Sequence, residues 1–224
     1  MEDSVFLIII QFLAFLLSVS VHECAHAWTA DKLGDPTARF LGRVSLNPIV
    51  HSDLVGTVIF PLIGAKFGFI FGWAKPVPVN VGRLRNPVRD HMLVAAAGPV
   101  SNMILALLMF SVLLAMKLTS PELAEMVRAV TAGRMPLGGI VPPLALVAYY
   151  GMIVNVILAV FNLIPIAPLD GAAVLSGLLP RGLAATLDRM QSYSMIIFVL
   201  LLVSGVPQVL FNPPIVALRR MLIA

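Results

Sequence analysis

Charged residues are scarce in this sequence of 224 residues: only 12% are Asp, Glu, Lys or Arg, whereas 59% are hydrophobic. A typical soluble domain carries roughly 25% charged residues, with which it covers its surface. The shortage excludes a soluble globular enzyme and a disordered chain, and it predicts an integral membrane protein. The length suits one domain, which we expect to span residues 1–224.

A basic cluster and a second cysteine are also missing. The chain has fifteen Lys and Arg against eleven Asp and Glu, and the basic residues are scattered through the loops. Binding to nucleic acid needs a basic patch, so we expect no nucleic-acid partner. Cys24 stands alone, which excludes a disulfide within the chain.

Long apolar stretches are abundant instead, and a helix needs about 20 apolar residues to cross a bilayer. We predict spans at about residues 5–28, 92–116, 144–164 and 194–211. A fifth stretch, 54–73, holds Pro61, Lys66 and four glycines, so we expect a broken or re-entrant segment there. The fold class is therefore an all-α polytopic membrane protein that sits in a lipid bilayer.

The first predicted span ends in His22-Glu23-Cys24-Ala25-His26, an HExxH motif. Residues four apart lie on one face of a helix, so His22 and His26 can bind one zinc ion together. Glu23 beside them could take a proton from a water on the metal. A polar helix end facing water is the alternative, although such groups are costly near a bilayer.

A third ligand has to come from elsewhere, because catalytic zinc takes three protein ligands and leaves one position open. Asp170 is the best candidate among the few acidic residues. It follows the 144–164 span after two prolines, Pro165 and Pro168, which break the helix, and Gly171 allows tight backbone geometry beside it. A polar turn that closes a helix is the alternative.

Charge placement tests whether the two halves of this site meet. No Lys or Arg precedes the first span, whereas Lys32, Arg39 and Arg43 follow it, so the positive-inside rule puts the histidines toward the cytoplasm. If 54–73 does not cross, Asp170 returns to the same side and ten of the fifteen basic residues lie inside. A full crossing would put Asp170 on the opposite side.

Several motifs follow one another in order: His22–His26, Asn47–Asp53, Gly72–Asn80, Gly98–Asn102, Asn162–Pro165 and Leu169–Gly171. Together they resemble the site-2 protease family of intramembrane zinc metalloproteases, in its compact bacterial and archaeal branch without PDZ or CBS domains. The resemblance implies a three-helix catalytic core with a small β element between its first two helices. We expect that element as a short edge strand at Val77–Val81, where the residues alternate, and one additional helix after the core.

The resemblance also implies functional roles. His22, His26 and Asp170 would bind one zinc ion per chain, and Glu23 would be the catalytic base. Asn162 would orient substrate or stabilise the oxyanion, with helix-end capping as the alternative. The substrates would be single-pass transmembrane proteins already trimmed by another protease, cut by regulated intramembrane proteolysis. We expect a multi-pass protein of the cell membrane with its active site toward the cytoplasm.

Other interpretations stay open at this point. A zinc transporter or metal-sensing membrane protein would also place histidines and carboxylates in a membrane. Prenyl-protein zinc proteases are a second enzymatic alternative. For Asn102 we favour a role in locking helices together, and we expect His51 and Asp53 to be a solvated loop pair.

Overall fold

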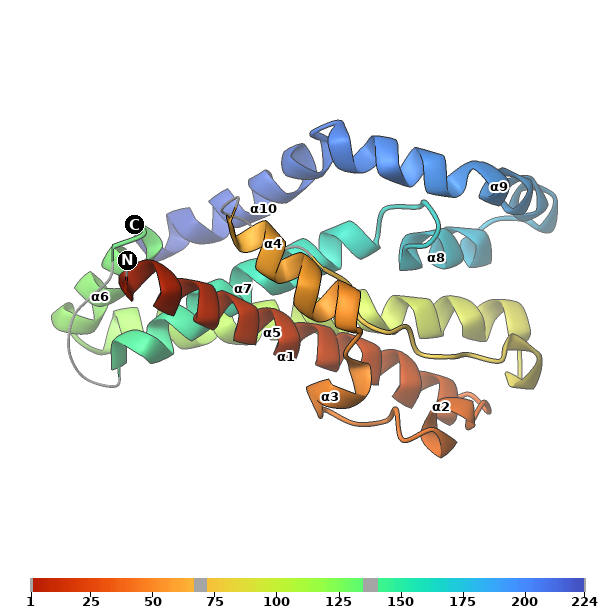
Figure 1. Ribbon diagram of the computed structural model, residues 1–224, viewed down its shortest axis with the longest axis horizontal. Helices are drawn as coiled ribbons and strands as arrows, with labels where there is room; N and C mark the ends of the chain where they lie inside the picture. Colours follow the sequence, from red (N-terminus) through yellow and green to blue (C-terminus); the bar gives the residue numbers. More distant parts are fainter. Residues whose placement is uncertain (1, 67–71, 135–140, 224) are drawn as a thin grey trace.

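Three long helices form the centre of the computed structural model, which describes residues 2–66, 72–134 and 141–223 (Figure 1). They are α1 (Glu2–Lys32), α5 (Pro87–Thr119) and α7 (Val141–Asn162). Each is long and apolar enough to cross a membrane. The all-α polytopic fold predicted from the composition is confirmed, and these helices contain or overlap the first three predicted spans.

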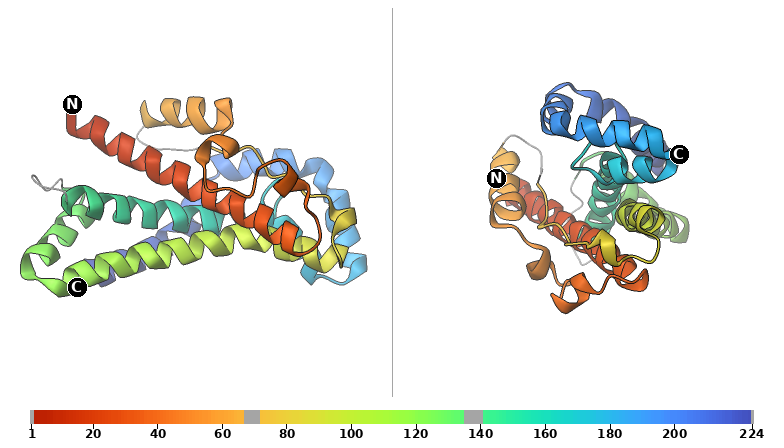
Figure 2. Two further views of the ribbon diagram at one scale, coloured as in Figure 1. Left: turned by 90° about the horizontal axis from the view of Figure 1, so that it is seen from below. Right: turned by 90° about the vertical axis from the view of Figure 1, so that its right-hand side faces the viewer.

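Small side chains let the three helices approach closely. α1 and α7 run in one direction and α5 runs in the opposite one (Figures 1 and 2). Ala106 of α5 and Ala145 and Ala159 of α7 are almost completely buried, and such residues allow helix backbones to come together within a membrane. Larger side chains, Leu113 and Met152, are completely buried in one core cluster that also includes Val127 and Val130.

A short helix that was not predicted, α6 (Pro121–Thr131), lies between α5 and α7. Ser120 caps it, because its Oγ accepts a hydrogen bond from the Leu123 N–H at 3.2 Å. Val127 and Val130 turn inward and are buried, while Glu122 and Glu125 are exposed. An amphipathic helix of this length carries too many charges to register as a span.

The chain after α7 forms three more helices: α8 (Asp170–Leu178), α9 (Arg181–Val203) and α10 (Val206–Ile223). The fourth span expected at 194–211 is interrupted, because Ser204 and Gly205 separate α9 from α10. The helical parts on either side of this break meet at 57°. Ser and Gly pairs are common sites of helix kinks, a signal that hydropathy alone does not contain.

The connection from α1 to α5 contains α2 (Thr37–Phe40), α3 (Pro48–His51), a π-helical turn η1 (Leu54–Ile59), α4 (Phe60–Lys66) and a 3-10 turn η2 (Val81–Arg83). This connection includes the expected broken segment 54–73, of which residues 67–71 lie outside the described residues.

The two ends of that segment lie side by side. The Trp73 N–H donates to the Gly56 carbonyl at 3.0 Å, and the Thr57 hydroxyl donates to the Trp73 carbonyl at 2.8 Å. The Lys75 N–H donates to the His51 carbonyl at 2.9 Å. The residues that precede α4 and those that follow residues 67–71 are therefore neighbours, so the segment begins and ends at the same place.

No strand forms within residues 2–66, 72–134 and 141–223, so the short strand expected at Val77–Val81 is wrong. The segment 74–80 is extended but has no partner strand. Pro76 and Pro78 lack an N–H, and the N–H groups of Val77 and Asn80 donate to carboxylates instead of to a neighbouring backbone. The alternating residues correctly indicated extended backbone, but the backbone hydrogen bonds to a neighbouring strand that they also predicted do not form.

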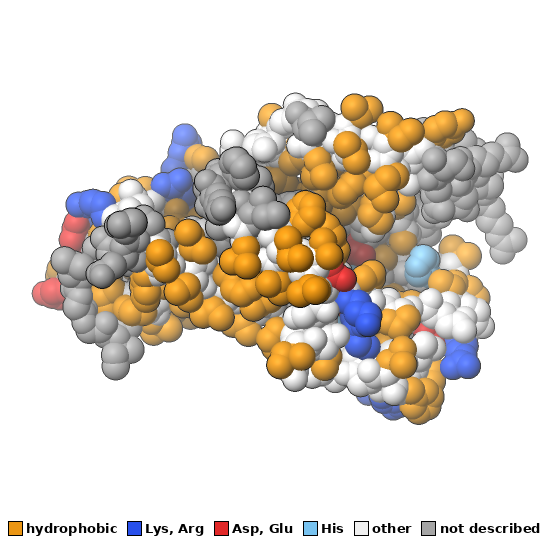
Figure 3. All heavy atoms as spheres, in the orientation of Figure 1, with side chains coloured by type: hydrophobic (Ala, Val, Ile, Leu, Met, Phe, Trp, Pro, Cys, Tyr) orange, Lys and Arg blue, Asp and Glu red, His pale blue; other side chains and the backbone are white. Residues whose placement is uncertain are grey.

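Figure 3 shows how this architecture suits a bilayer. Hydrophobic side chains cover most of the visible face between the end at α6 and the region of α2 and α3. Exposed apolar residues of this kind are Leu13 and Leu17 of α1 and Leu107 and Leu108 of α5. Apolar side chains in such numbers on the outside of three long helices are typical of contact with lipid.

Candidate metal centre

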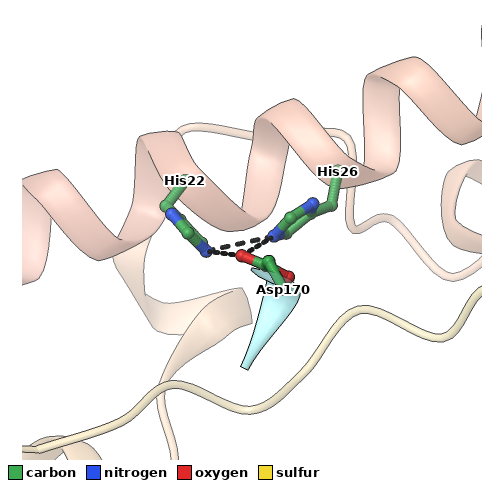
Figure 4. A group of neighbouring side chains, drawn as sticks. All are labelled: His22, His26 and Asp170. Atoms are coloured by element: carbon green, nitrogen blue, oxygen red, sulfur yellow. Dashed lines mark hydrogen bonds and ion pairs between the residues drawn. The ribbon is translucent and has the colours of Figure 1, made fainter. Parts of the chain in front are cut away.

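The three predicted ligands meet between α1 and the start of α8 (Figure 4). Oδ2 of Asp170 lies 3.2 Å from Nε2 of His22 and 3.4 Å from Nε2 of His26. The two Nε2 atoms are 3.0 Å apart. Both histidines are buried, and Asp170 is partly buried. Residues separated by almost 150 positions in the sequence thus point three ligand atoms at one spot.

This arrangement fits a tetrahedral metal ion. Ligands at about 2.0–2.1 Å from zinc in tetrahedral geometry are separated by about 3.3 Å, close to the three distances observed. Oδ2 of Asp170 is buried and makes no hydrogen bond of normal geometry to the described residues. A buried oxygen without a partner is rare, and a cation between the three atoms would satisfy it.

Asp170 is suited to act as an anionic ligand. Burial by itself would raise the pKa of its carboxyl, but the two neighbouring histidine side chains lower that pKa to about 2. The carboxylate also lies in the first turn of α8, where the helix dipole favours negative charge.

The outer nitrogen of each histidine ring is held by α5. Nδ1 of His22 lies 2.6 Å from Oδ1 of Asn102, and Nδ1 of His26 lies 2.7 Å from the carbonyl of Val94. Both partners are acceptors, so Nδ1 of each ring is the donor, and with a metal bound Nε2 would offer its lone pair as the ligand. The helix opposite α1 therefore sets the tautomer of both rings.

Close approach of α5 to the histidines depends on Gly98. A Cβ atom at this residue would lie 2.5 Å from Cε1 of His22 and 2.5 Å from Nε2 of His26. Such distances are far inside van der Waals contact, so only glycine leaves room for both rings.

Asp170 reaches the centre through a turn, as its prolines predicted. α7 ends at Asn162, residues 163–169 are non-helical, and Asp170 is the first residue of α8. Asp170 therefore begins a helix instead of lying within the broken stretch that Pro165 and Pro168 predicted. Gly171 next to it is needed for the tight turn, because a Cβ there would lie 2.3 Å from the Leu163 carbonyl oxygen.

Asn102 has a wider role than the predicted helix lock. Its Nδ2 donates to the carbonyl of Ser18 at 3.2 Å and to Oδ1 of Asn155 at 2.7 Å, and Asn155 donates to the Ser18 hydroxyl at 2.8 Å. This buried network joins α1, α5 and α7 and ends on His22. The orientation of a ligand by Asn102 was missed because the sequence did not show which helix faces the histidines.

Glu23 lies beside the ligands and contacts the extended segment. Its Oε2 accepts a hydrogen bond from the Val77 N–H at 2.9 Å. The segment is held further along by Asp35, whose Oδ2 accepts from the Asn80 N–H at 2.6 Å. Asp35 is fully buried, yet its hydrogen bonds from Thr37 and Asn80 outweigh the desolvation and lower its pKa.

The remaining predicted residues make no hydrogen bond or ion pair with the three ligands among the described residues. Asn162 is the last residue of α7, and its amide donates to the Leu158 carbonyl at 3.0 Å, which is the helix-end role left open as an alternative. His51 is 1% exposed, with Nε2 2.7 Å from the Ser45 carbonyl, so the expected solvated pair with Asp53 is wrong. Asp53 instead caps η1 by accepting from the Gly56 N–H.

The sequence model of peptidase family M50 matches residues 10–205, which is most of the chain. The chain belongs to peptidase family M50. This is the site-2 protease family that the motifs resemble. The match includes α5 and α7 as well as all three ligand residues, so the M50 assignment covers the whole centre.

Two relatives agree with the M50 assignment. The chain is 38% identical over 192 residues to YwhC of Bacillus subtilis (strain 168), a protein named as a zinc metalloprotease; the match covers 86% of this chain and 79% of YwhC. It is 29% identical over 105 residues to Rip2 of Mycolicibacterium smegmatis, which bears the same description, with 47% of this chain and 39% of Rip2 covered. No solved structure matches the chain.

Replacing Asn102 with alanine should weaken metal binding. The substitution removes the acceptor that holds the Nδ1 proton of His22, and losing such a partner lowers metal affinity by about 10- to 100-fold. Competition with a chelator of known zinc affinity measures this. Asn155→Ala is the matched control, because it cuts the same network but leaves Oδ1 of Asn102 facing His22. Equal losses in both variants would show that helix packing, not ring orientation, is responsible.

Gly98→Ala should disrupt the centre while the helices stay folded. The added methyl group has to displace the rings of His22 and His26, so the purified variant should contain much less than one metal ion per chain. Gly182→Ala serves as the control, because nothing lies within 4 Å of a Cβ at that residue. Element analysis together with circular dichroism checks both variants, and full metal content in Gly98→Ala would contradict the close approach.

Proposed function

We propose that this M50 peptidase is a zinc metalloprotease that cuts peptide bonds of membrane-spanning proteins within the bilayer or at its edge. The observation that carries this proposal is the convergence of His22, His26 and Asp170, with Glu23 beside them. Three ligands plus an adjacent carboxylate are the donor set of a catalytic zinc site. The site lies among three helices long and apolar enough to span a membrane, which supports a substrate in the same membrane.

The chemistry divides between the ion and the chain. Zinc held by His22, His26 and Asp170 would polarise the scissile carbonyl and lower the pKa of water in the fourth position. Glu23 takes the proton from the attacking water and later gives it to the nitrogen of the leaving amine, so the peptide bond is replaced by a carboxylate and an amine. Asn162 is our candidate for orienting the substrate, once its amide leaves the Leu158 carbonyl.

The extended segment 74–80 offers the substrate a place to pair. A transmembrane helix has its carbonyls hydrogen-bonded, so it has to unwind before a peptide bond is attacked. The Val77 carbonyl and both backbone groups of Val79 have no hydrogen-bond partner among the described residues. In extended backbone, residues two apart face the same side, so these groups share the edge that touches Glu23. An unwound substrate could add to this edge as a strand.

The centre belongs at the cytoplasmic side in this proposal. The hydrogen bonds that join Gly56 to Trp73 and His51 to Lys75 support a segment that enters and leaves on one side. If that segment is re-entrant, the ends of α1 and α7 and the start of α5 lie on the same side of the membrane. The positive-inside rule predicts that this is the cytoplasmic side of the cell membrane. Single-pass proteins trimmed beforehand by another protease are the substrates we propose for regulated intramembrane proteolysis.

Glu23→Gln should abolish cleavage but keep zinc. Glutamine preserves the size of the side chain and cannot accept the proton, while the three ligands stay in place. The measurement is cleavage of a single-pass substrate in proteoliposomes, with zinc content determined on the same sample. His26→Ala is the companion variant and should lose both zinc and cleavage. Activity retained in Glu23→Gln would rule out Glu23 as the base.

Labelling of single cysteines should place Asn80 and Glu122 on opposite sides of the membrane. In a Cys24→Ala background, Asn80→Cys should react with a membrane-impermeant maleimide only in inside-out vesicles, because it lies beside the centre. Glu122→Cys, in α6 at the far end of α5, should react in intact cells. Labelling of Asn80→Cys from outside would contradict the re-entrant topology.

A further inference from the structure

A cavity of about 380 Å³ lies beside the metal centre, and neither the three ligands nor Glu23 lines it. One wall is formed by Leu169, which precedes α8, and by Ala173 and Ser176 of α8. The opposite wall is the first two turns of α5, with Val88 and His91, and Val81 of η2 lies at the border. Its volume is at the small end of the range of ligand-binding pockets, so it suits one or two side chains and not a large molecule.

The cavity and the metal centre are neighbours along two helices, because residues close in sequence to the centre line the cavity. Asp170 at the start of α8 points to the histidines, while Leu169 just before it and Ala173 one turn later line the cavity. On α5, His91 lies one turn before Val94, whose carbonyl holds His26. A chain whose peptide bond reached the three ligands would therefore have its next side chains at the mouth of this cavity.

The extended segment leads to the same place. Its Val77 N–H donates to Glu23, and four residues later Val81 lines the cavity. A substrate strand paired along Val77 and Val79 would run between the catalytic base and the cavity. The segment, the centre and the cavity thus define one path.

The lining matches the chemistry of an unwound transmembrane segment. Most of the surrounding side chains are small and apolar, among them Ala172, Ala173 and Gly177. The two polar side chains, His91 and Ser176, have no hydrogen-bond partner among the described residues. An unwound segment combines apolar side chains with peptide groups that have lost their hydrogen bonds, and these two residues can satisfy such groups.

We propose that this cavity binds an apolar side chain of the substrate close to the cleaved bond, and that Ala173 limits the size of that side chain. This inference rests on the proposed proteolytic function. It assigns the cavity to an apolar residue of a membrane-spanning substrate, with His91 and Ser176 hydrogen-bonded to the backbone around it.

Disulfide cross-linking tests the occupant without requiring cleavage. The zinc-loaded protein carries Ser176→Cys together with Glu23→Gln and Cys24→Ala. The probe is a designed single-pass peptide with an alanine- and leucine-rich span, a Gly-Ser pair that favours unwinding, and one cysteine moved through six consecutive positions around that pair. We expect a cross-link at one or two adjacent positions only. Leu178→Cys, 67% exposed on the same helix and outside the cavity, is the control.

Substrate selectivity provides the second test. Ala173→Leu fills part of the cavity, so the ratio of kcat/KM for a probe with leucine at the cross-linking position to that for a probe with alanine should fall by about 10-fold or more. Leu178→Phe enlarges α8 outside the cavity and should leave this ratio at the wild-type value.

The outcomes separate the cavity from the proteolytic function. Absence of a cross-link to Ser176→Cys, or cross-links no more selective than those of Leu178→Cys, would overturn the assignment of the cavity even if the wild type cleaves. An unchanged ratio in a folded Ala173→Leu variant would overturn the role of Ala173. A selective cross-link with no cleavage of any probe by the zinc-loaded wild type would instead contradict the proposed protease.

Discussion

The centre depends on two hydrogen bonds between the histidine rings of α1 and acceptors of α5. Asn102 and the Val94 carbonyl hold the Nδ1 protons of His22 and His26, and this directs both Nε2 lone pairs toward Asp170. Gly98 lets the two helices approach closely enough for these bonds to form. If α5 moved away, the rings would lose both their tautomer and their orientation, and three separate polar residues would remain in an apolar setting.

In that apolar setting, burying a polar group without a hydrogen bond costs free energy. Buried polar side chains are therefore hydrogen-bonded to one another. Asn102, Asn155 and Ser18 satisfy one another across α1, α5 and α7, and the chain of hydrogen bonds ends on a ligand. Outside the bundle, Glu23 and Asp35 hold the extended segment 74–80 through its N–H groups. Carboxylates replace a partner strand there, while the Val77 carbonyl and both backbone groups of Val79 have no hydrogen-bond partner among the described residues.

Residues with a fixed local spacing were predictable. His22 and His26 are one helical turn apart whatever surrounds them, and Asp170 stood out because few acidic residues follow an apolar helix. Features that depend on neighbours were not predictable in the same way. The alternation at Val77–Val81 indicated extended backbone but not its missing partner strand, the break at Ser204–Gly205 was hidden within an apolar run, and His51 looked solvated although the fold buries it.

The sequence by itself determined that this is a membrane protein, which residues could bind a metal, and which carboxylate lies next to them. These features depend only on composition and on the spacing of residues within one helix. Only the tertiary structure decided that Asp170 lies within 3.4 Å of both histidine Nε2 atoms, that Asn102 and Val94 orient the histidines, and that a cavity lies beside the centre. These features arise where α1, α5 and α8 meet, and the distance between helices is set by packing of the whole bundle rather than by any one segment.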